Sequence, residues 1–96
     1  MAYILDEDLV RKQMPEVFKS TSIYQQGKEL KVSKFRIESA SFNKKFDLTY
    51  QVSGLAKISI IREDGEYEDL YSYSTRITVN KEDKIESCKE IYLNKF

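Results

Sequence analysis

Apolar and polar residues alternate over three long stretches of this chain, and this alternation constrains the fold more than any other feature. The stretches are residues 46–52, 56–60 and 71–79. A period of two residues belongs to a β-strand, in which successive side chains point to opposite faces. Strands with one apolar and one polar face are typical of antiparallel sheets that bury one side. The sequence therefore predicts a sheet with one face on a core and the other in water.

Two further strands complete the predicted sheet. Leu30 and Val32 alternate, whereas Phe35 and Ile37 fall on the opposite parity. Both pairs can face one core only if an extra residue near Ser33 forms a bulge. Residues 85–93 form the last strand. Turns are expected at residues 53–54, 64–65 and 80–83, and the Asp-Gly pair at 64–65 is the strongest hairpin signal.

Two short helices are expected before the first strand. Asp6–Met14 has acids in its first turn and bases later, which suits the helix dipole, and Pro15 ends the pattern. Ser20–Gln26 follows, with a serine to cap its start and Gly27 to supply the left-handed residue after its end. Tyr24 would then point toward the sheet.

Length and order of these elements define the expected fold class. A chain of 96 residues fits one small domain, residues 1–96. Five Phe and seven Tyr supply large contact areas for its core. We expect an α+β domain in which two short N-terminal helices pack on one face of a five-stranded antiparallel meander.

Cysteine use and the absence of long apolar runs predict the compartment. Cys88 is the only cysteine and cannot form an intramolecular disulfide, which indicates a reducing environment. The segment Met1–Asp6 has no basic residue and only a short apolar run, so we do not expect a signal peptide. No apolar run approaches the ~18 residues of a membrane span. These features predict a cytoplasmic protein without a membrane partner.

Residue types needed for catalysis are scarce. The chain has no histidine, which removes the commonest general base and metal ligand. Cys88 beside Lys89 is the one candidate nucleophile, but we expect it to be a small filler in the last strand. One cysteine without histidine cannot form a zinc site, and the acids at 63–69 lack a calcium-loop pattern. We therefore expect no catalytic residue, no metal and no cofactor, with an enzyme using Cys88 as the alternative.

The charges are balanced in number but not in position. There are 16 basic and 16 acidic residues. Residues 11–62 hold eleven bases and four acids, a net charge of +7, whereas residues 63–96 hold nine acids and five bases, a net charge of −4. Residues 1–10 contribute the remaining −3. A molecule with this distribution can offer both an acidic and a basic surface.

The acidic part contains the first candidate site. Acids surround a tyrosine in the hairpin predicted at 64–65, and tyrosine is enriched in protein interfaces. Tyr71 and Tyr73 share the parity of the core, so Tyr67 is the tyrosine expected to be exposed. The alternative is a solvated hairpin tip kept soluble by its charge. The candidate protein-binding residues are Glu63, Asp64, Glu66, Tyr67, Glu68 and Asp69.

The basic part contains the second candidate site. Bases of the first strand should project from its outer face, with two more at its turn, enough for ~4–5 phosphate contacts and salt-sensitive nucleic-acid binding. The alternative is a solvated sheet face whose lysines discourage aggregation at an edge. The candidate nucleic-acid-binding residues are Lys31, Lys34, Arg36, Lys44 and Lys45.

Three short motifs resemble one family. They are Ser22-x-Tyr24-x-x-Gly27-Lys28-x-Leu30, Tyr50-x-Val52-x-Gly54-x-x-Lys57-Ile58-x-Ile60 and Lys84-Ile85-x-Ser87-Cys88. Over roughly residues 20–90 the chain is similar to the β-rich region of SWIM-type modules, found in bacterial Snf-type DNA translocases. Glu90 stands where the second zinc cysteine of that family would be, and the later Cys-x-His pair is missing. The resemblance implies a zinc-free module that binds nucleic acid or protein.

Together these features predict a non-enzymatic binding module. The first hypothesis is a protein-binding protein that uses the acidic hairpin. Its size and its lysine-rich, glycine-poor composition fit a phage or mobile-element inhibitor of the anti-CRISPR or anti-restriction type. The alternative is a SWIM-like module that binds nucleic acid weakly through the basic face. An open sheet edge would also allow a homodimer.

Overall fold

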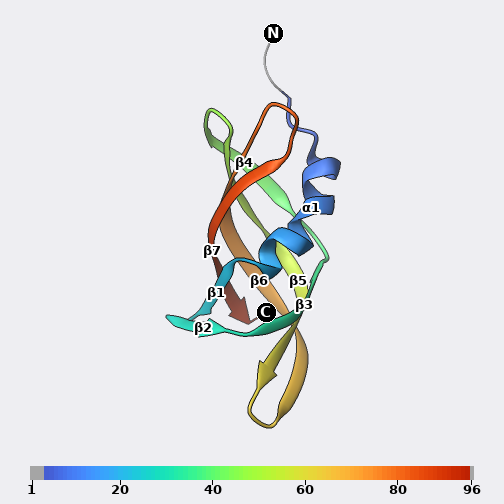
Figure 1. Cartoon of the computed structure of the whole chain (residues 1–96), viewed down its shortest axis with the longest axis vertical. Coiled ribbons are helices and arrows are strands. Elements are labelled where there is room, and N and C mark those ends of the chain that lie inside the picture. The colour runs from blue at the N-terminus through green and yellow to red at the C-terminus, as the bar shows by residue number, and fades with distance from the viewer. Residues whose placement is uncertain (1–3, 96) are drawn as a thin grey trace.

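The structure, a computed structural model, describes residues 4–95. Residues 1–3, on which part of the signal-peptide argument rests, and residue 96 lie outside this range. The described residues form one helix followed by seven strands (Figure 1). Their bounds are α1 Glu7–Lys19, β1 Ser22–Gln25, β2 Lys28–Leu30, β3 Val32–Ile37, β4 Ser41–Phe46, β5 Thr49–Arg62, β6 Gly65–Val79 and β7 Ile85–Lys95.

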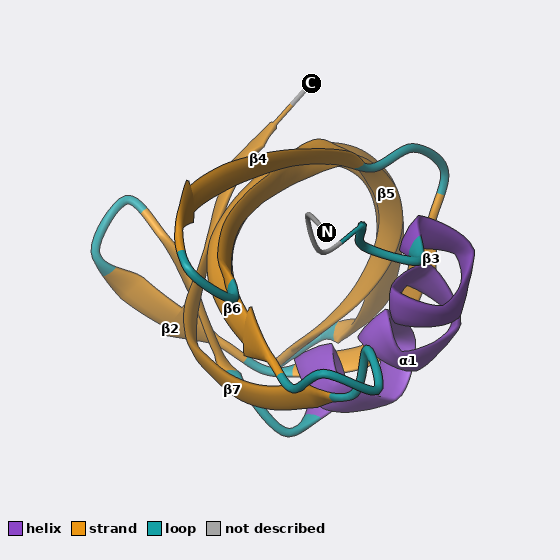
Figure 2. Cartoon of the chain, turned by 90° about the horizontal axis from the view of Figure 1, so that it is seen from above, coloured by secondary structure: helices purple, strands orange, loops and turns teal. Residues whose placement is uncertain are grey.

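The strands form one curled, mostly antiparallel sheet. Its order is β2-β1-β7-β6-β5-β3, with β4 also paired to β5, and among the described strands only β1 and β7 run parallel. Residues 28–37 pair with β1 at their start and with β5 at their end, so this one segment connects the two edges. Seen along its length, the sheet closes into an almost complete ring with α1 at its side (Figure 2). The prediction of two helices on a five-stranded meander is therefore wrong, because the fold is mostly β and its sheet is mixed.

Helix α1 begins where the sequence predicts and ends later. Asp6 caps it by accepting a hydrogen bond from the Leu9 amide at 3.2 Å. The predicted end at Pro15 is wrong, because α1 continues to Lys19 and buries Val10, Met14 and Phe18 on one face. Proline removes one backbone N–H donor, but burial of an apolar stripe at i, i+4 and i+8 favours continuation of the helix.

The predicted second helix, residues 20–26, is a strand. β1 pairs with β2 across a two-residue turn in which Gln26 and Gly27 have φ of 51° and 78°. Gly27 thus has the left-handed conformation that we predicted, but in a hairpin turn and not after a helix. Ile23 and Tyr24 are a β-branched and an aromatic residue, which suit a strand once a neighbour is present. That neighbour is β7, from the other end of the sequence.

The first half of the sheet confirms one prediction and corrects another. The register of β3 against β5 shifts between Val32 and Lys34, which confirms the bulge expected near Ser33. Residues 46–52 are not one strand, because a turn at Asp47, whose φ is 40°, separates β4 from β5. Phe46 consequently leaves the core side and is 60% exposed.

Gly54 lies in the middle of β5, so the predicted turn at residues 53–54 is wrong. The loop between β3 and β4 lies against β5 at this position, and the Ser39 amide donates to the Leu55 carbonyl at 3.0 Å. A Cβ atom on Gly54 would lie 2.1 Å from the Ser39 carbonyl oxygen. The glycine is required for this close approach between two backbones.

The second half of the sheet agrees with the sequence. A hairpin at Asp64-Gly65 connects β5 to β6, a turn over residues 80–83 follows, and β7 is the last strand. The predicted core face of β6 is confirmed, since Tyr71, Tyr73, Thr75, Ile77 and Val79 are all buried.

The core lies between α1 and the inner face of the sheet. Phe18, Phe35 and Tyr73 pack edge to face, with ring centroids 5.0 to 5.9 Å apart. The Tyr73 hydroxyl donates to the Ser39 carbonyl at 2.7 Å, which satisfies the polar end of a buried ring.

The side chain of Gln13 on α1 also covers backbone groups at the start of β7. The Gln13 amide donates to the Asp83 carbonyl at 2.7 Å and accepts from the Ile85 amide at 3.0 Å. This side chain satisfies backbone groups as a neighbouring strand would. Within residues 4–95, no helix has the length and apolar character needed to cross a membrane.

We expect Gly54→Ala to lower the free energy of unfolding by about 3 kcal/mol, the upper end of the usual cost of overpacking. The new methyl group would meet the Ser39 backbone, which cannot move without breaking the loop contacts with β5. Urea unfolding measures the change. Ser53→Ala, on the exposed neighbouring residue, is the control and should change stability by less than about 0.5 kcal/mol. Equal losses in both variants would contradict the explanation.

Alkaline pH should destabilise the protein through Tyr73. Burial raises the pKa of Tyr73 to about 12 from an ordinary value of 10.0. Between these values the unfolded chain loses the proton and the native state keeps it. The free energy of unfolding should therefore fall as pH rises from 10 to 12, by about 2–3 kcal/mol from this group.

The matched variant for this effect is Tyr73→Phe. It should be less stable at pH 7 by about 1 kcal/mol, because the bond to Ser39 is lost. Its stability should decline less steeply above pH 10 than that of the wild type. Urea unfolding at pH 7, 9 and 11 makes the comparison, and parallel declines would refute the assignment to Tyr73.

Candidate functional site

The end of β5 and the start of β6 form a hairpin that extends beyond the rest of the sheet (Figure 1). β7 pairs with β6 only from Tyr71 onward, and β3 pairs with β5 only up to Ile60. We call residues 61–70 the hairpin tip. Residues 61–69 are all exposed, including the six residues predicted to bind protein: Glu63, Asp64, Glu66, Tyr67, Glu68 and Asp69.

The register divides the hairpin tip into two faces. Tyr67 and Asp69 continue the face of the buried Tyr71. Tyr67 is 48% exposed, whereas Tyr71 and Tyr73 are buried, as the sequence predicts. Glu66 and Glu68 lie on the outer face. The acids therefore do not form one patch but surround the tip on both sides.

Hydrogen bonds hold several of these side chains in place. The Tyr67 hydroxyl donates to Asp64 at 2.8 Å, and this bond raises the pKa of Tyr67. Asp69 accepts from the Leu70 amide at 2.8 Å and pairs with Lys95 at 3.1 Å. These contacts lower the pKa of Asp69, and the hydrogen bond from the Leu70 amide has the largest effect. The tip is thus a preordered surface, with Asp69 ionised at neutral pH.

The hairpin tip also has an open strand edge. Residues 65–70 of β6 pair with β5 on one side, and within residues 4–95 no strand pairs with their other side. Unpaired backbone N–H and C=O groups along a strand can accept another strand by addition. The acids beside this edge disfavour pairing between two copies of the tip.

The five bases predicted to bind nucleic acid are exposed but are not gathered on one face. Lys34 and Arg36 are on the outer face of β3, whereas Lys44 lies opposite the inward-facing Tyr50. Lys31 and Lys45 are exposed at a strand junction and beside a bulge. On the outer face, only Ser59 of β5 separates the positions of Lys34 and Glu68, so opposite charges alternate there.

Cys88 has a structural environment. It is half-buried on β7 opposite Ile77 and packs against the core. Its sulfur lies 3.3 Å from the Thr75 hydroxyl. Among residues 4–95, no three His, Cys, Asp or Glu side chains are arranged to hold a metal ion.

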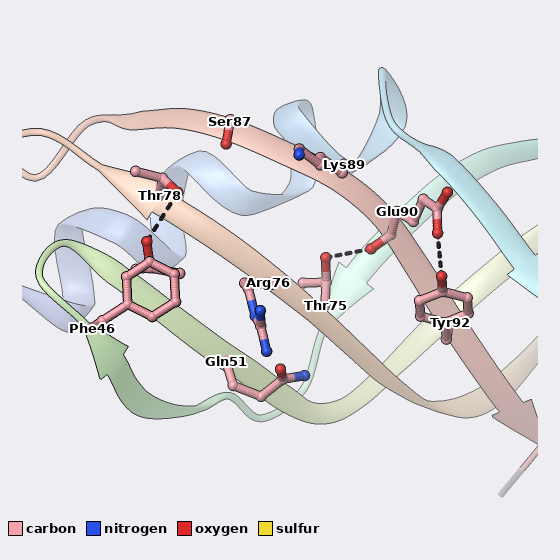
Figure 3. Close-up of a pocket in the computed structure, with 10 residues that line it drawn as sticks. Phe46, Gln51, Thr75, Arg76, Thr78, Ser87, Lys89, Glu90 and Tyr92 are labelled. Carbon is pink, nitrogen blue, oxygen red and sulfur yellow. Dashed lines mark hydrogen bonds between the residues drawn. The ribbon is translucent and has the colours of Figure 1, made fainter.

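A groove on the outer face of the sheet was not predicted. It crosses β5, β6 and β7, has a volume of about 490 Å³, and carries Arg76 near its middle (Figure 3). Phe46 and Tyr92 lie at opposite ends of it (Figure 3). Its lining residues are Phe46, Thr49, Gln51, Thr75, Arg76, Thr78, Ser87, Lys89, Glu90 and Tyr92.

The groove depends on local irregularities that alternation alone does not reveal. The turn at Asp47 moves Phe46 to the outer face beside Thr49. On β7 the pairing with β6 shifts between Ile77 and Thr75, and Lys89 lies in this irregular stretch. In the sequence, Arg76 and Thr78 alternate with the core residues of β6, which predicts that they face solvent. This alternation does not predict that the surface around them is hollowed.

Comparisons with models of protein families, with curated proteins and with solved structures find no match.

Proposed function

We propose that this protein is a non-enzymatic, cytoplasmic binding module that captures a partner protein through its hairpin tip. The observation that carries the proposal is the protrusion of residues 61–70 beyond the sheet with one strand edge unpaired. Protruding acids and an exposed tyrosine suit a partner with a basic, concave surface.

The same tip favours a particular mode of binding. A partner strand that pairs with the open edge of β6 would gain main-chain hydrogen bonds along residues 65–70. Tyr67 would then contribute contact area on one face, and Glu66 and Glu68 would meet bases on the other. A basic groove that normally holds nucleic acid has this character, which fits an inhibitor of the anti-CRISPR or anti-restriction type from a phage or mobile element.

Photo-crosslinking in bacterial lysate tests the location of binding. Tyr67→p-benzoylphenylalanine should give one discrete adduct, identified by mass spectrometry. The same replacement at Tyr92, which is similarly exposed but lies on the outer face of the body, should not give it. The same adduct from both positions would contradict binding at the tip.

Charge reversal tests the chemistry with the crosslinked partner. Glu66→Lys with Glu68→Lys should lower affinity by about tenfold or more, because both side chains would then repel a basic surface. Glu82→Lys with Glu86→Lys makes the same charge change on exposed residues away from the tip and should have little effect. Hydrogen exchange should show new protection at residues 65–70 in the complex, and unchanged exchange there would exclude strand addition.

A further inference from the structure

The groove places two large aromatic rings, Phe46 and Tyr92, among lining residues that are otherwise polar. Phe46 is 60% exposed and Tyr92 is 52% exposed. Tyr92 is held in position, since its ring packs on Tyr24 with centroids 6.3 Å apart and its hydroxyl donates to Glu90. An exposed ring fixed from one side leaves its other side available for stacking.

The groove between the rings is cationic and rich in hydrogen-bonding groups. Arg76 and Lys89 are exposed, and within residues 4–95 the one ion pair joins Lys95 to Asp69, far from both. The Thr49 and Thr78 hydroxyls lie 3.3 Å apart, and the Gln51 amide donates to Ser74 at 2.7 Å. The lining also holds the carboxylate of Glu90, which accepts from Tyr92 and forms no ion pair with either cation, so the groove keeps a net positive charge that suits an anionic ligand such as a phosphate.

The separation of the rings indicates how long that ligand is. Phe46 lies opposite Thr49, and Tyr92 is linked through Ser74 to Ser53, four residues further along β5. The Cα atoms of Phe46 and Tyr92 are thus about 13 Å apart along the strand direction. Across the strands, from β4 through β5 and β6 to β7, they are three strand spacings apart, which is about 14 Å. Stacked rings have centroids about 4.5–7 Å apart, so these two rings cannot enclose one base.

We propose that the groove binds single-stranded nucleic acid, with different bases stacked on Phe46 and Tyr92 and the intervening phosphates paired with Arg76 and Lys89. Aromatic platforms combined with uncompensated cations are the general means of binding single strands without sequence readout. A duplex keeps its bases stacked inside and offers the rings no base face. This site differs from the five bases suggested by the sequence, and it is separate from the hairpin tip.

Fluorescence anisotropy with a labelled short single-stranded oligonucleotide, at about 50 and 200 mM salt, tests the proposal. Phe46→Ala and Tyr92→Ala should each weaken binding about 5- to 100-fold, and Tyr92→Phe should retain affinity because it keeps the ring. Arg76→Gln with Lys89→Gln should weaken binding and flatten the salt slope by about 1.4, as expected for two lost phosphate contacts.

Matched variants separate the groove from the general charge of the protein. Lys34→Gln with Arg36→Gln removes the same charge from another part of the outer face and should change affinity less than about twofold. Tyr67→Ala removes an equally exposed ring from the hairpin tip and should leave binding unchanged. Glu90→Gln should strengthen binding, because it removes the one anion of the groove lining but keeps an acceptor for Tyr92.

Several outcomes of the binding measurements would overturn the proposal. They are no binding of the oligonucleotide at 50 mM salt, equal losses in the groove variants and their matched controls, or equal affinity for duplex and single strand. A nucleoside monophosphate should compete poorly, because it can reach one ring only. Competition as strong as that of the oligonucleotide would show a single-base site and would also contradict the arrangement.

Discussion

The edge-to-face packing of Phe18, Phe35 and Tyr73 is the contact on which the rest of the structure depends. It joins α1, β3 and β6, which come from three different parts of the chain. α1 buries Val10, Met14 and Phe18 in the core that the inner face of the curled sheet forms. The same Tyr73 anchors the loop between β3 and β4 through Ser39, and that loop lies directly against Gly54. The interior packing thus fixes the path of the backbone on the surface.

Parts of this architecture can be deduced from residue order and parts cannot. The core face of β6, the bulge after Val32 and the hairpin at Asp64-Gly65 follow from alternation and turn chemistry, which are local properties. The segment from Ser20 to Gly27 satisfies the rules for a capped helix and for a hairpin equally well. Its state is decided by pairing with β7, a contact that no local rule contains. Gly54 is similar, since a close approach of Ser39 and a turn both call for glycine.

The candidate sites show the same division. Exposure of the acids and of Tyr67 could be predicted, because residues beside a hairpin turn extend away from a core. The open edge of β6 could not, because it results from where β7 stops pairing. The groove could not be predicted either, since Phe46 changes faces through the positive φ of Asp47. Register decides which surface residues act together, and register is a property of the assembled sheet.

The parallel pairing of β1 with β7 has a consequence for biosynthesis. The ribosome synthesises β1 well before β7, because five other strands lie between them in the sequence, so β1 lacks this neighbour while those strands are made. During this time the β6 edge that β7 will cover is also unpaired. The ring can therefore close only after residues 85–95 have left the exit tunnel, and closing contacts this distant in sequence are of the kind that slows folding. Unpaired strand edges are prone to aggregate during this period, and charged side chains beside them oppose that pairing.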